Sequence, residues 1–151
     1  MSKRIDLKSL PVVTGSGYPA PFDAPCAARV RQRLGDAAAL TDFGVNLLRL
    51  SPGVWSSQRH WHTAEDEFVY VVAGEVVLVT DAGEEVLRAG DCAGFKAGEP
   101  NGHQLQNRSD QSALVREVGS RRPHEDVTEY SDIDLRYSEA GGDMHKDGTP
   151  Y

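Results

Sequence analysis

The sequence lacks the features that mark secreted and membrane proteins. It has two cysteines, Cys26 and Cys92, which are too few for a disulfide framework and match no zinc or redox spacing. No apolar run approaches the roughly 20 residues that cross a bilayer, and the first residues contain no apolar segment typical of a secretory signal. We therefore expect a cytoplasmic protein with no membrane partner and with both cysteines reduced.

Positive charge is also scarce. The chain has 16 lysines and arginines against 23 acidic residues, which gives a net charge of −7. The negative electrostatic field of such a chain repels nucleic acid. The pair Arg121-Arg122 is too short to form a basic patch. Nucleic acid is therefore not expected as a partner.

Helical patterns are nearly missing as well. Only Leu34–Thr41 could form a helical turn, whereas short runs such as "EFVYVV" and "EVVLVT" end at glycines. Short strands separated by turn signals at regular intervals are typical of antiparallel sandwiches and barrels. The sequence therefore predicts an all-β fold of this kind.

The 151 residues fit a single domain. We expect an N-terminal arm with the first strand or strands in residues 1–40, a barrel core in 41–120 and a polar C-terminal extension in 121–151. The extension has no apolar period, so His124 and His145 are expected to be solvated side chains and not ligands.

Histidine is rare, with five residues in the chain, yet His60 and His62 stand two apart. In an extended strand these positions project from one face, so both imidazoles point into one volume while Trp61 points away. Glu67 follows five residues later, and His103 lies in a second glycine-framed stretch. This pattern favours a metal site, and the alternative is a core histidine beside a solvated acidic turn.

The glycines and candidate ligands form two blocks with regular spacing. The first block reads Gly53, six residues, His60, one, His62, four, Glu67, six, Gly74; the second reads Gly90, five residues, Lys96, one, Gly98, four, His103, three, Asn107. The two blocks resemble the two motifs of the cupin superfamily, over roughly residues 40–119. Two departures, Lys96 in place of a usual proline and a different loop length before His103, fall beside the expected site.

The resemblance implies a double-stranded β-helix barrel, or jelly-roll-like sandwich, with short N- and C-terminal arms. It also implies that the barrel core carries both motifs and that one divalent metal ion is held by His60, His62, Glu67 and His103. Three imidazoles and one carboxylate suit iron, manganese, nickel, cobalt or zinc, and affinity alone does not choose among them. Open coordination positions would be left for water or substrate, so the reacting group is expected there and no catalytic side chain is assigned.

Strand parity extends the prediction to a small-molecule pocket. Residues two or four positions from a ligand on the same strand point to the same side as that ligand. They would give the pocket an apolar floor and a few amide groups. The expected pocket-lining residues are Gln58, Val69, Val71, Leu105 and Asn107. The expected core consists of Val69, Val71, Val76, Leu78, Leu105, Leu114 and Val118.

The resulting functional hypothesis is a metal-dependent enzyme that acts on a small oxygenated metabolite. The reaction could be that of a sugar or sugar-phosphate isomerase or epimerase, or that of a dioxygenase or lyase, because fold alone does not decide. The alternative is a non-catalytic small-molecule-binding or sensor protein. We also expect a two-fold homodimer in which residues 1–25 help to cover the partner, since exposed sheet edges favour pairing.

Overall fold

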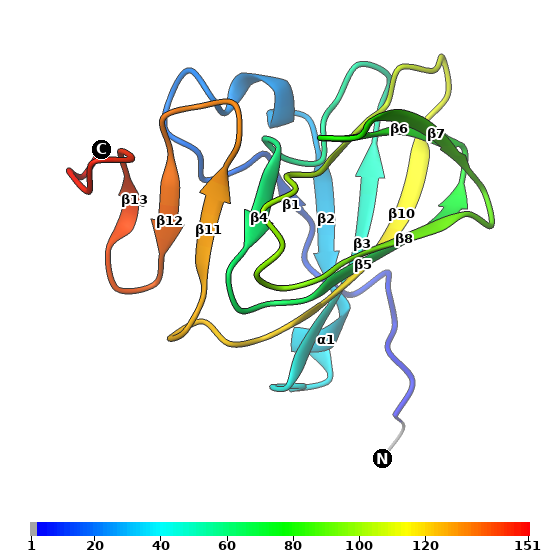
Figure 1. The fold of residues 1–151 in the computed structure, drawn as a ribbon. Helices are drawn as coiled ribbons and strands as arrows, with labels where there is room; N and C mark the ends of the chain where they lie inside the picture. Colours follow the sequence, from blue (N-terminus) through cyan, green and yellow to red (C-terminus); the bar gives the residue numbers. More distant parts are fainter. Residues whose placement is uncertain (1–2) are drawn as a thin grey trace.

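Short strands separated by tight turns make up almost all of the regular structure, as the sequence predicts (Figure 1). The computed structural model describes residues 3–151, so the first two residues of the predicted arm lie outside it. Gly74 shows why glycine punctuates this chain: its φ is +76°, and a Cβ there would lie 2.7 Å from the backbone oxygen of Ser112. Only glycine accepts such a turn without strain.

The largest sheet has six strands and forms one wall of the barrel. All of its neighbouring strands are antiparallel. In spatial order they are β1 (Val13–Thr14), β2 (Val30–Arg33), β3 (Phe43–Leu50), β10 (Ala113–Ser120), β5 (Glu67–Ala73) and β8 (Cys92–Phe95).

A second sheet of three strands encloses the core together with this wall. Its strands are β7 (Gly83–Arg88), β6 (Glu75–Thr80) and β9 (Gln104–Gln106). The core cluster consists of Leu48, Leu50, Val54, Val69, Val71, Val76, Leu78, Leu105, Ala113 and Val115. Burial of each large aliphatic side chain contributes about 1.5–3 kcal/mol, so this cluster is the main source of the barrel's stability.

The core differs from the prediction on β10. Leu114 and Val118 were expected inside, but both are only partly buried, whereas Ala113 and Val115 are fully buried. The register explains the difference, because Val115 lies opposite the buried Leu48 and therefore shares its inward face. A one-residue change of parity moves every side chain of a strand to the other face.

The C-terminal segment forms more structure than the predicted polar extension. It provides three of the four strands in the third sheet, at the left of Figure 1. In spatial order the strands are β13 (Gly142–Met144), β12 (Arg136–Ser138), β11 (Val127–Tyr130) and β4 (His60–His62). Thr128 and Tyr130 are buried at alternating positions of β11, so the segment has an inward face despite its polar composition.

The N-terminal arm packs against its own barrel. Gly15 donates a backbone hydrogen bond to Arg29 at 2.9 Å, and the side-chain amide of Gln58 donates to the carbonyl of Phe22 at 2.8 Å. A short 3₁₀ turn (Ala24–Cys26) comes next, and the helical turn expected near residue 34 is α1 (Leu34–Ala37). The arm thereby brings its residues close to the strand that carries His60.

Among residues 3–151, no helix is long and apolar enough to cross a membrane.

Candidate metal centre

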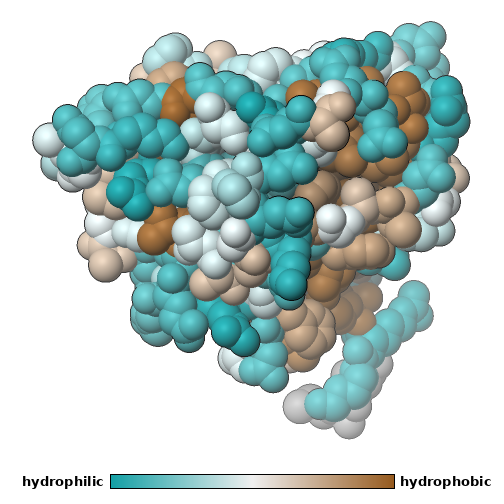
Figure 2. Space-filling model, viewed as in Figure 1, coloured by the Kyte–Doolittle hydropathy of each residue, from teal (hydrophilic) through white to brown (hydrophobic). Residues whose placement is uncertain are grey.

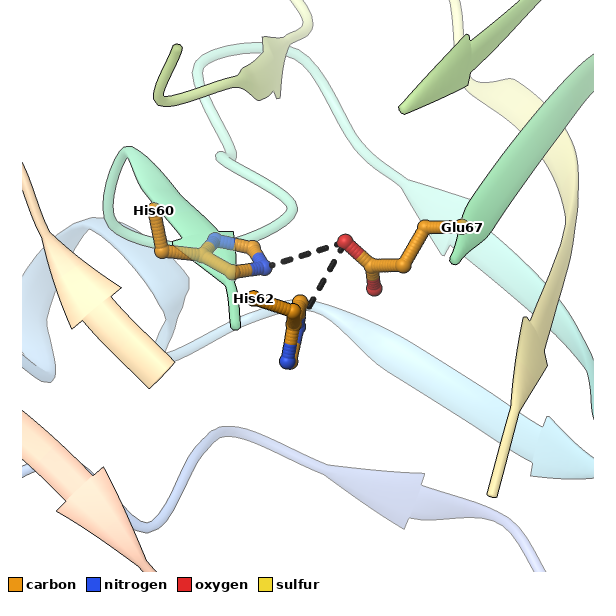
Figure 3. Close-up of side chains that lie close together, drawn as sticks. All are labelled: His60, His62 and Glu67. Atoms are coloured by element: carbon orange, nitrogen blue, oxygen red, sulfur yellow. Dashed lines mark ion pairs between the residues drawn. The ribbon is translucent and has the colours of Figure 1, made fainter. Parts of the chain in front are cut away.

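His60 and His62 lie on β4, and Glu67 lies at the start of β5 (Figure 3). Strand β4 is fixed on one side by β11, through the pairs Tyr130–His60 and Thr128–His62. On the other side His60 and His103 form an isolated antiparallel bridge with backbone hydrogen bonds of 3.1 and 2.8 Å. The backbone alone therefore brings the two sequence blocks to one place.

The three histidines converge on one carboxylate oxygen. The Nε2 atoms of His60, His62 and His103 lie 3.4, 3.5 and 2.7 Å from Oε2 of Glu67. Figure 3 shows the side chains of His60 and His62 turned toward the carboxylate, and ligand atoms of His60, His62 and Glu67 all lie within 4.8 Å of one another. The structure thus brings together all four residues that the sequence suggested as ligands.

The hydrogen bond of His60 fixes its tautomer. Nδ1 lies 2.8 Å from the carbonyl oxygen of Gln58, and since a carbonyl only accepts, Nδ1 carries the proton and donates it. In the neutral ring Nε2 then presents a lone pair to the Glu67 carboxylate. Two lone pairs facing each other attract only when a proton or a metal cation lies between them, so this donor set fits a metal ion.

His62 is oriented by a carboxylate behind it. Its Nδ1 donates to Oδ2 of Asp126 at 2.6 Å, while the other oxygen of Asp126 accepts from the backbone N–H of Ala64 at 2.9 Å. Burial alone would lower the pKa of His62, but hydrogen bonds to Asp126 and Glu67 outweigh it and raise that pKa to about 10. A carboxylate behind a metal-binding histidine is a common arrangement that fixes the ring and raises its basicity.

His103 is held by packing. Its ring stacks on Phe95 with centroids 3.6 Å apart and planes within 1°, and its Nδ1 is buried with no hydrogen-bond partner among the described residues. Burial lowers the pKa of His103. The pKa of Glu67 lies well below its usual value, because its interactions with the three histidines, the hydrogen bond from His103 first, outweigh the opposing effect of burial.

The candidate ligands form a wall between two cavities. The larger has a volume of about 570 Å³ and is lined by His60, Glu67 and His103; the smaller, of about 300 Å³, is lined by His62, Glu67 and His103. A group bound between these side chains would therefore be accessible to a small molecule in the larger cavity, whose size is within the usual range for ligand sites.

The predicted pocket residues divide into two groups. Val69 and Leu105 line the larger cavity. Gln58, Val71 and Asn107 line neither cavity: Val71 is fully buried in the core, and the amides of Gln58 and Asn107 donate to backbone carbonyls. All three side chains are buried, because protein atoms fill the part of the inward face that the two cavities do not reach.

Sequence reasoning missed Asp126 and a row of arginines. Asp126 comes from the segment that was expected to be a polar extension, and no local pattern identifies it. The arginines Arg29, Arg31 and Arg33 all line the larger cavity. The sequence does contain a pattern that predicts this row: in "ARVRQRL" every second residue is an arginine, which places three cations on one face of a strand.

The comparisons with known proteins agree with this architecture. The cupin domain family, Cupin_2, matches residues 46–119. A crystal structure of a sugar phosphate isomerase from the cupin superfamily of Silicibacter pomeroyi DSS-3 is 46% identical, with a TM-score of 0.92, over 98% of this chain and 96% of that chain. A structure from Acidithiobacillus ferrooxidans, provisionally assigned as a sugar phosphate isomerase, is 30% identical, with a TM-score of 0.69, over 74% of this chain and 70% of that one.

A more distant structure shows the fold alone. The polyketide cyclase RemF from Streptomyces resistomycificus is 20% identical, with a TM-score of 0.67, over 88% of this chain and 87% of that one. A comparison with curated proteins finds no match. The all-β cupin barrel predicted from the two sequence blocks is confirmed, and the chain belongs to the cupin superfamily.

Proposed function

We propose that this cupin is a metal-dependent isomerase of phosphorylated sugars. The observation that carries the proposal is the convergence of three histidine Nε2 atoms on Glu67 at the wall of a cavity of about 570 Å³. The similarity to the Silicibacter pomeroyi sugar phosphate isomerase, at 46% identity over nearly the whole chain, supports the substrate class.

The proposed ligands of one divalent ion are His60, His62, Glu67 and His103. Mixed imidazole and carboxylate donors suit iron, manganese, nickel, cobalt or zinc. A bound ion would withdraw charge from a carbonyl or hydroxyl oxygen of the substrate. The chain's own residues orient that ion and its neighbours: Asp126 and the carbonyl of Gln58 hold two of the imidazoles from behind.

Glu117 is the side chain that we propose to move the proton. When an aldose becomes a ketose by proton transfer, a base removes the proton from C2 and returns it to C1, while a second proton moves from the C2 oxygen to the C1 oxygen. Glu117 lines the larger cavity and lies opposite Val69, diagonally across from Glu67, a relationship that separates Cα atoms by about 7–8 Å. Arg31 and Asn46 hold its carboxylate by hydrogen bonds of 2.9–3.0 and 3.4 Å.

Tyr130 provides a neutral hydroxyl on the same wall. Its ring lies 5.8 Å from that of His60, and its partner Tyr18 meets it edge-on at 5.5 Å. Burial and a hydrogen bond to Tyr18 raise the pKa of Tyr130 far above neutrality, so the hydroxyl keeps its proton and stays neutral beside the proposed ligands.

The test is solvent exchange at a substrate carbon. Protein loaded separately with iron(II), manganese, nickel, cobalt or zinc is incubated in D₂O with a panel of aldose and ketose phosphates, and NMR follows deuterium incorporation at C1 and C2. We expect interconversion and exchange with at least one metal, and their loss in Glu117→Gln at unchanged metal content. Substrate binding without interconversion under any metal would overturn the isomerase and favour a binding or sensor role, and oxygen uptake would favour a dioxygenase. Interconversion without exchange would overturn the proton-transfer role of Glu117.

A further inference from the structure

Three arginines stand in a row on the inward face of β2. Arg31 and Arg33 belong to the strand, Arg29 directly precedes it, and all three line the larger cavity. The register sets their direction, because Arg31 lies opposite the fully buried Leu48 of β3. Residues two apart on a strand share a face, so three cations point to the side of the sheet that holds the metal ligands.

Two of the arginines have carboxylate partners. Arg31 binds Glu117 through two hydrogen bonds, of 2.9 and 3.0 Å. The side chain of Arg33 is 60% exposed and lies 3.9 Å from Asp36. Both charges are therefore balanced, one inside the cavity and one at its rim.

Arg29 has no such partner within residues 3–151. It is 9% exposed, and its Nε and Nη1 donate to the backbone carbonyls of Gly15, at 3.0 Å, and Ser56. Its Nη2 donates to no described residue. A buried guanidinium without an ion-pair partner is costly. Burial, and after it the charge of Arg31, lower the pKa of Arg29, and the more distant charge of Glu117 opposes them only in part.

Hydroxyl groups accompany this unpaired cation. Ser16, next to Gly15, lines the same cavity and has a buried hydroxyl with no hydrogen-bond partner in the described chain. Ser57, next to Ser56, also lines it, and its hydroxyl has only the Ser56 hydroxyl, at 3.3 Å, as partner. Buried polar groups without a partner are rare in folded proteins. The hydroxyl of Ser16 is such a group and lies in the cavity that Arg29 also lines, which indicates a missing hydrogen-bond partner there.

The distance between Arg29 and the candidate metal ligands is short enough for one bound molecule to contact both. Ser56, which binds Arg29 through its carbonyl, precedes His60 by four residues, which an extended chain spans in at most about 13–14 Å. Tyr18 lies along this wall, where its hydroxyl accepts a hydrogen bond from the backbone of Gln58 at 3.3 Å. An open-chain sugar phosphate can extend over such a distance.

We propose that Arg29, with the hydroxyls of Ser16 and Ser57, binds the phosphate group of the substrate while the sugar reaches the metal ligands. The inference rests on the proposed function for its choice of phosphate. Guanidinium groups bind phosphate through paired, charge-assisted hydrogen bonds, and this one lies where an anion would balance the buried charge.

Binding of inorganic phosphate to metal-free protein tests the subsite without the metal or turnover. Calorimetry compares the wild-type chain, Arg29→Gln and the matched control Arg33→Gln, which removes a cation from the same strand face. We expect Arg29→Gln to weaken phosphate binding by about ten- to hundredfold, the loss expected for charge-assisted hydrogen bonds, and Arg33→Gln to change it by less than about threefold. Equal affinities in wild type and Arg29→Gln, or no binding by the wild type at millimolar phosphate, would overturn the proposal.

Two further arms separate the possible failures. Ribose 5-phosphate, ribose and acetate distinguish a phosphate ester from a neutral sugar and from a carboxylate; binding of acetate in preference to phosphate would overturn the phosphate assignment. If ribose 5-phosphate binds through Arg29 but no sugar phosphate is isomerised, the proposed isomerase activity is overturned and the phosphate subsite stands. Isomerisation with a KM unaffected by Arg29→Gln would support the isomerase but overturn the phosphate subsite. If Arg29→Gln does not fold by circular dichroism, Ser16→Ala and Arg29→Lys replace it, and unchanged phosphate affinity in both would reject the subsite.

Discussion

Asp126 accepts a hydrogen bond from Nδ1 of His62 at 2.6 Å across 64 positions of sequence. This contact joins the C-terminal sheet to the cupin motif, because Asp126 stands just before β11 and His62 ends β4. The side chain of Asp126 is 8% exposed and that of His62 14%, so the bond is shielded from solvent. The C-terminal segment therefore contributes to the candidate metal centre as well as to the fold.

Asp126→Asn should weaken metal binding by about 10–100-fold, the usual effect of losing a carboxylate behind a metal-binding histidine. The amide keeps the size of the side chain and can still accept from Ala64, but it holds no charge for the imidazole. Competition with a chromophoric chelator measures the affinity. Asp132→Asn, which alters an exposed carboxylate paired with Arg59, is the control; an equal loss in both variants would contradict the role given to Asp126.

Metal affinity should rise with pH between about 7 and 9. The metal-free protein holds a proton on His62 up to its pKa of about 10, whereas a metal binds only the unprotonated nitrogen. Glu67 stays ionised throughout, because its pKa lies well below the usual value. Binding must therefore release one proton at His62, so affinity should increase about tenfold per pH unit.

Calorimetry in two buffers of different ionisation enthalpy counts this proton directly at each pH. The Asp126→Asn variant should show a weaker pH dependence, since the pKa of its His62 loses a main cause of its elevation. An affinity that is constant between pH 7 and 9 would show that His62 is already neutral in the metal-free protein.

His103→Ala should remove the metal and leave a folded barrel. The core cluster contains no metal ligand, so the strands are held without the ion. Loss of the stacked ring against Phe95 should lower the free energy of unfolding by about 1–3 kcal/mol. Circular dichroism follows the fold and elemental analysis follows the metal.

Glu67→Gln is the gentler companion of this variant, since it keeps the shape of the side chain and removes the one negative ligand. It should weaken metal binding while retaining the β-rich spectrum. An unfolded His103→Ala protein at room temperature would instead make the site structural, and the proposed chemistry would lose its main support.

We expect the chain to form a homodimer through the outer face of the six-stranded sheet. Phe68, Tyr70 and Val72 alternate with the buried residues of β5 and are 41%, 39% and 38% exposed. Figure 2 shows more hydrophobic surface on the right of the molecule, where strands of the barrel lie, than over the C-terminal sheet at the left. Contiguous exposed apolar surface of this kind is typical of protein interfaces, and the N-terminal arm is engaged with its own barrel.

Light scattering at micromolar concentration should give twice the chain mass, and Tyr70→Glu should reduce it to one chain. Val86→Glu adds the same charge at a residue 44% exposed on β7, outside this sheet, and should leave the dimer intact. A monomeric wild-type chain would reject the interface.

Local rules were enough to predict most of the strands and turns between residues 43 and 120 and the shared face of His60 and His62. The full set of four candidate ligands, in contrast, came from the resemblance to the cupin motifs. Alternation puts His60 and His62 on one face, and a residue such as Gly74 is required where φ is positive. The two blocks were also enough to predict the cupin barrel, because both glycine-framed motifs and their ligands are present despite the different loop length before His103.

The choice of inward face and the distant residues that complete the site depend on tertiary structure. Alternation defines two faces of β10 but does not tell which face is buried. The pairing with β3 and β5 places Val115 inside and leaves Leu114, on the opposite face, only partly buried. In the same way, Asp126 reaches His62, and Arg29 reaches the cavity, through strand pairs formed between segments far apart in the chain. Local periodicity carries no information about such pairings, because they are selected by how all the strands pack together.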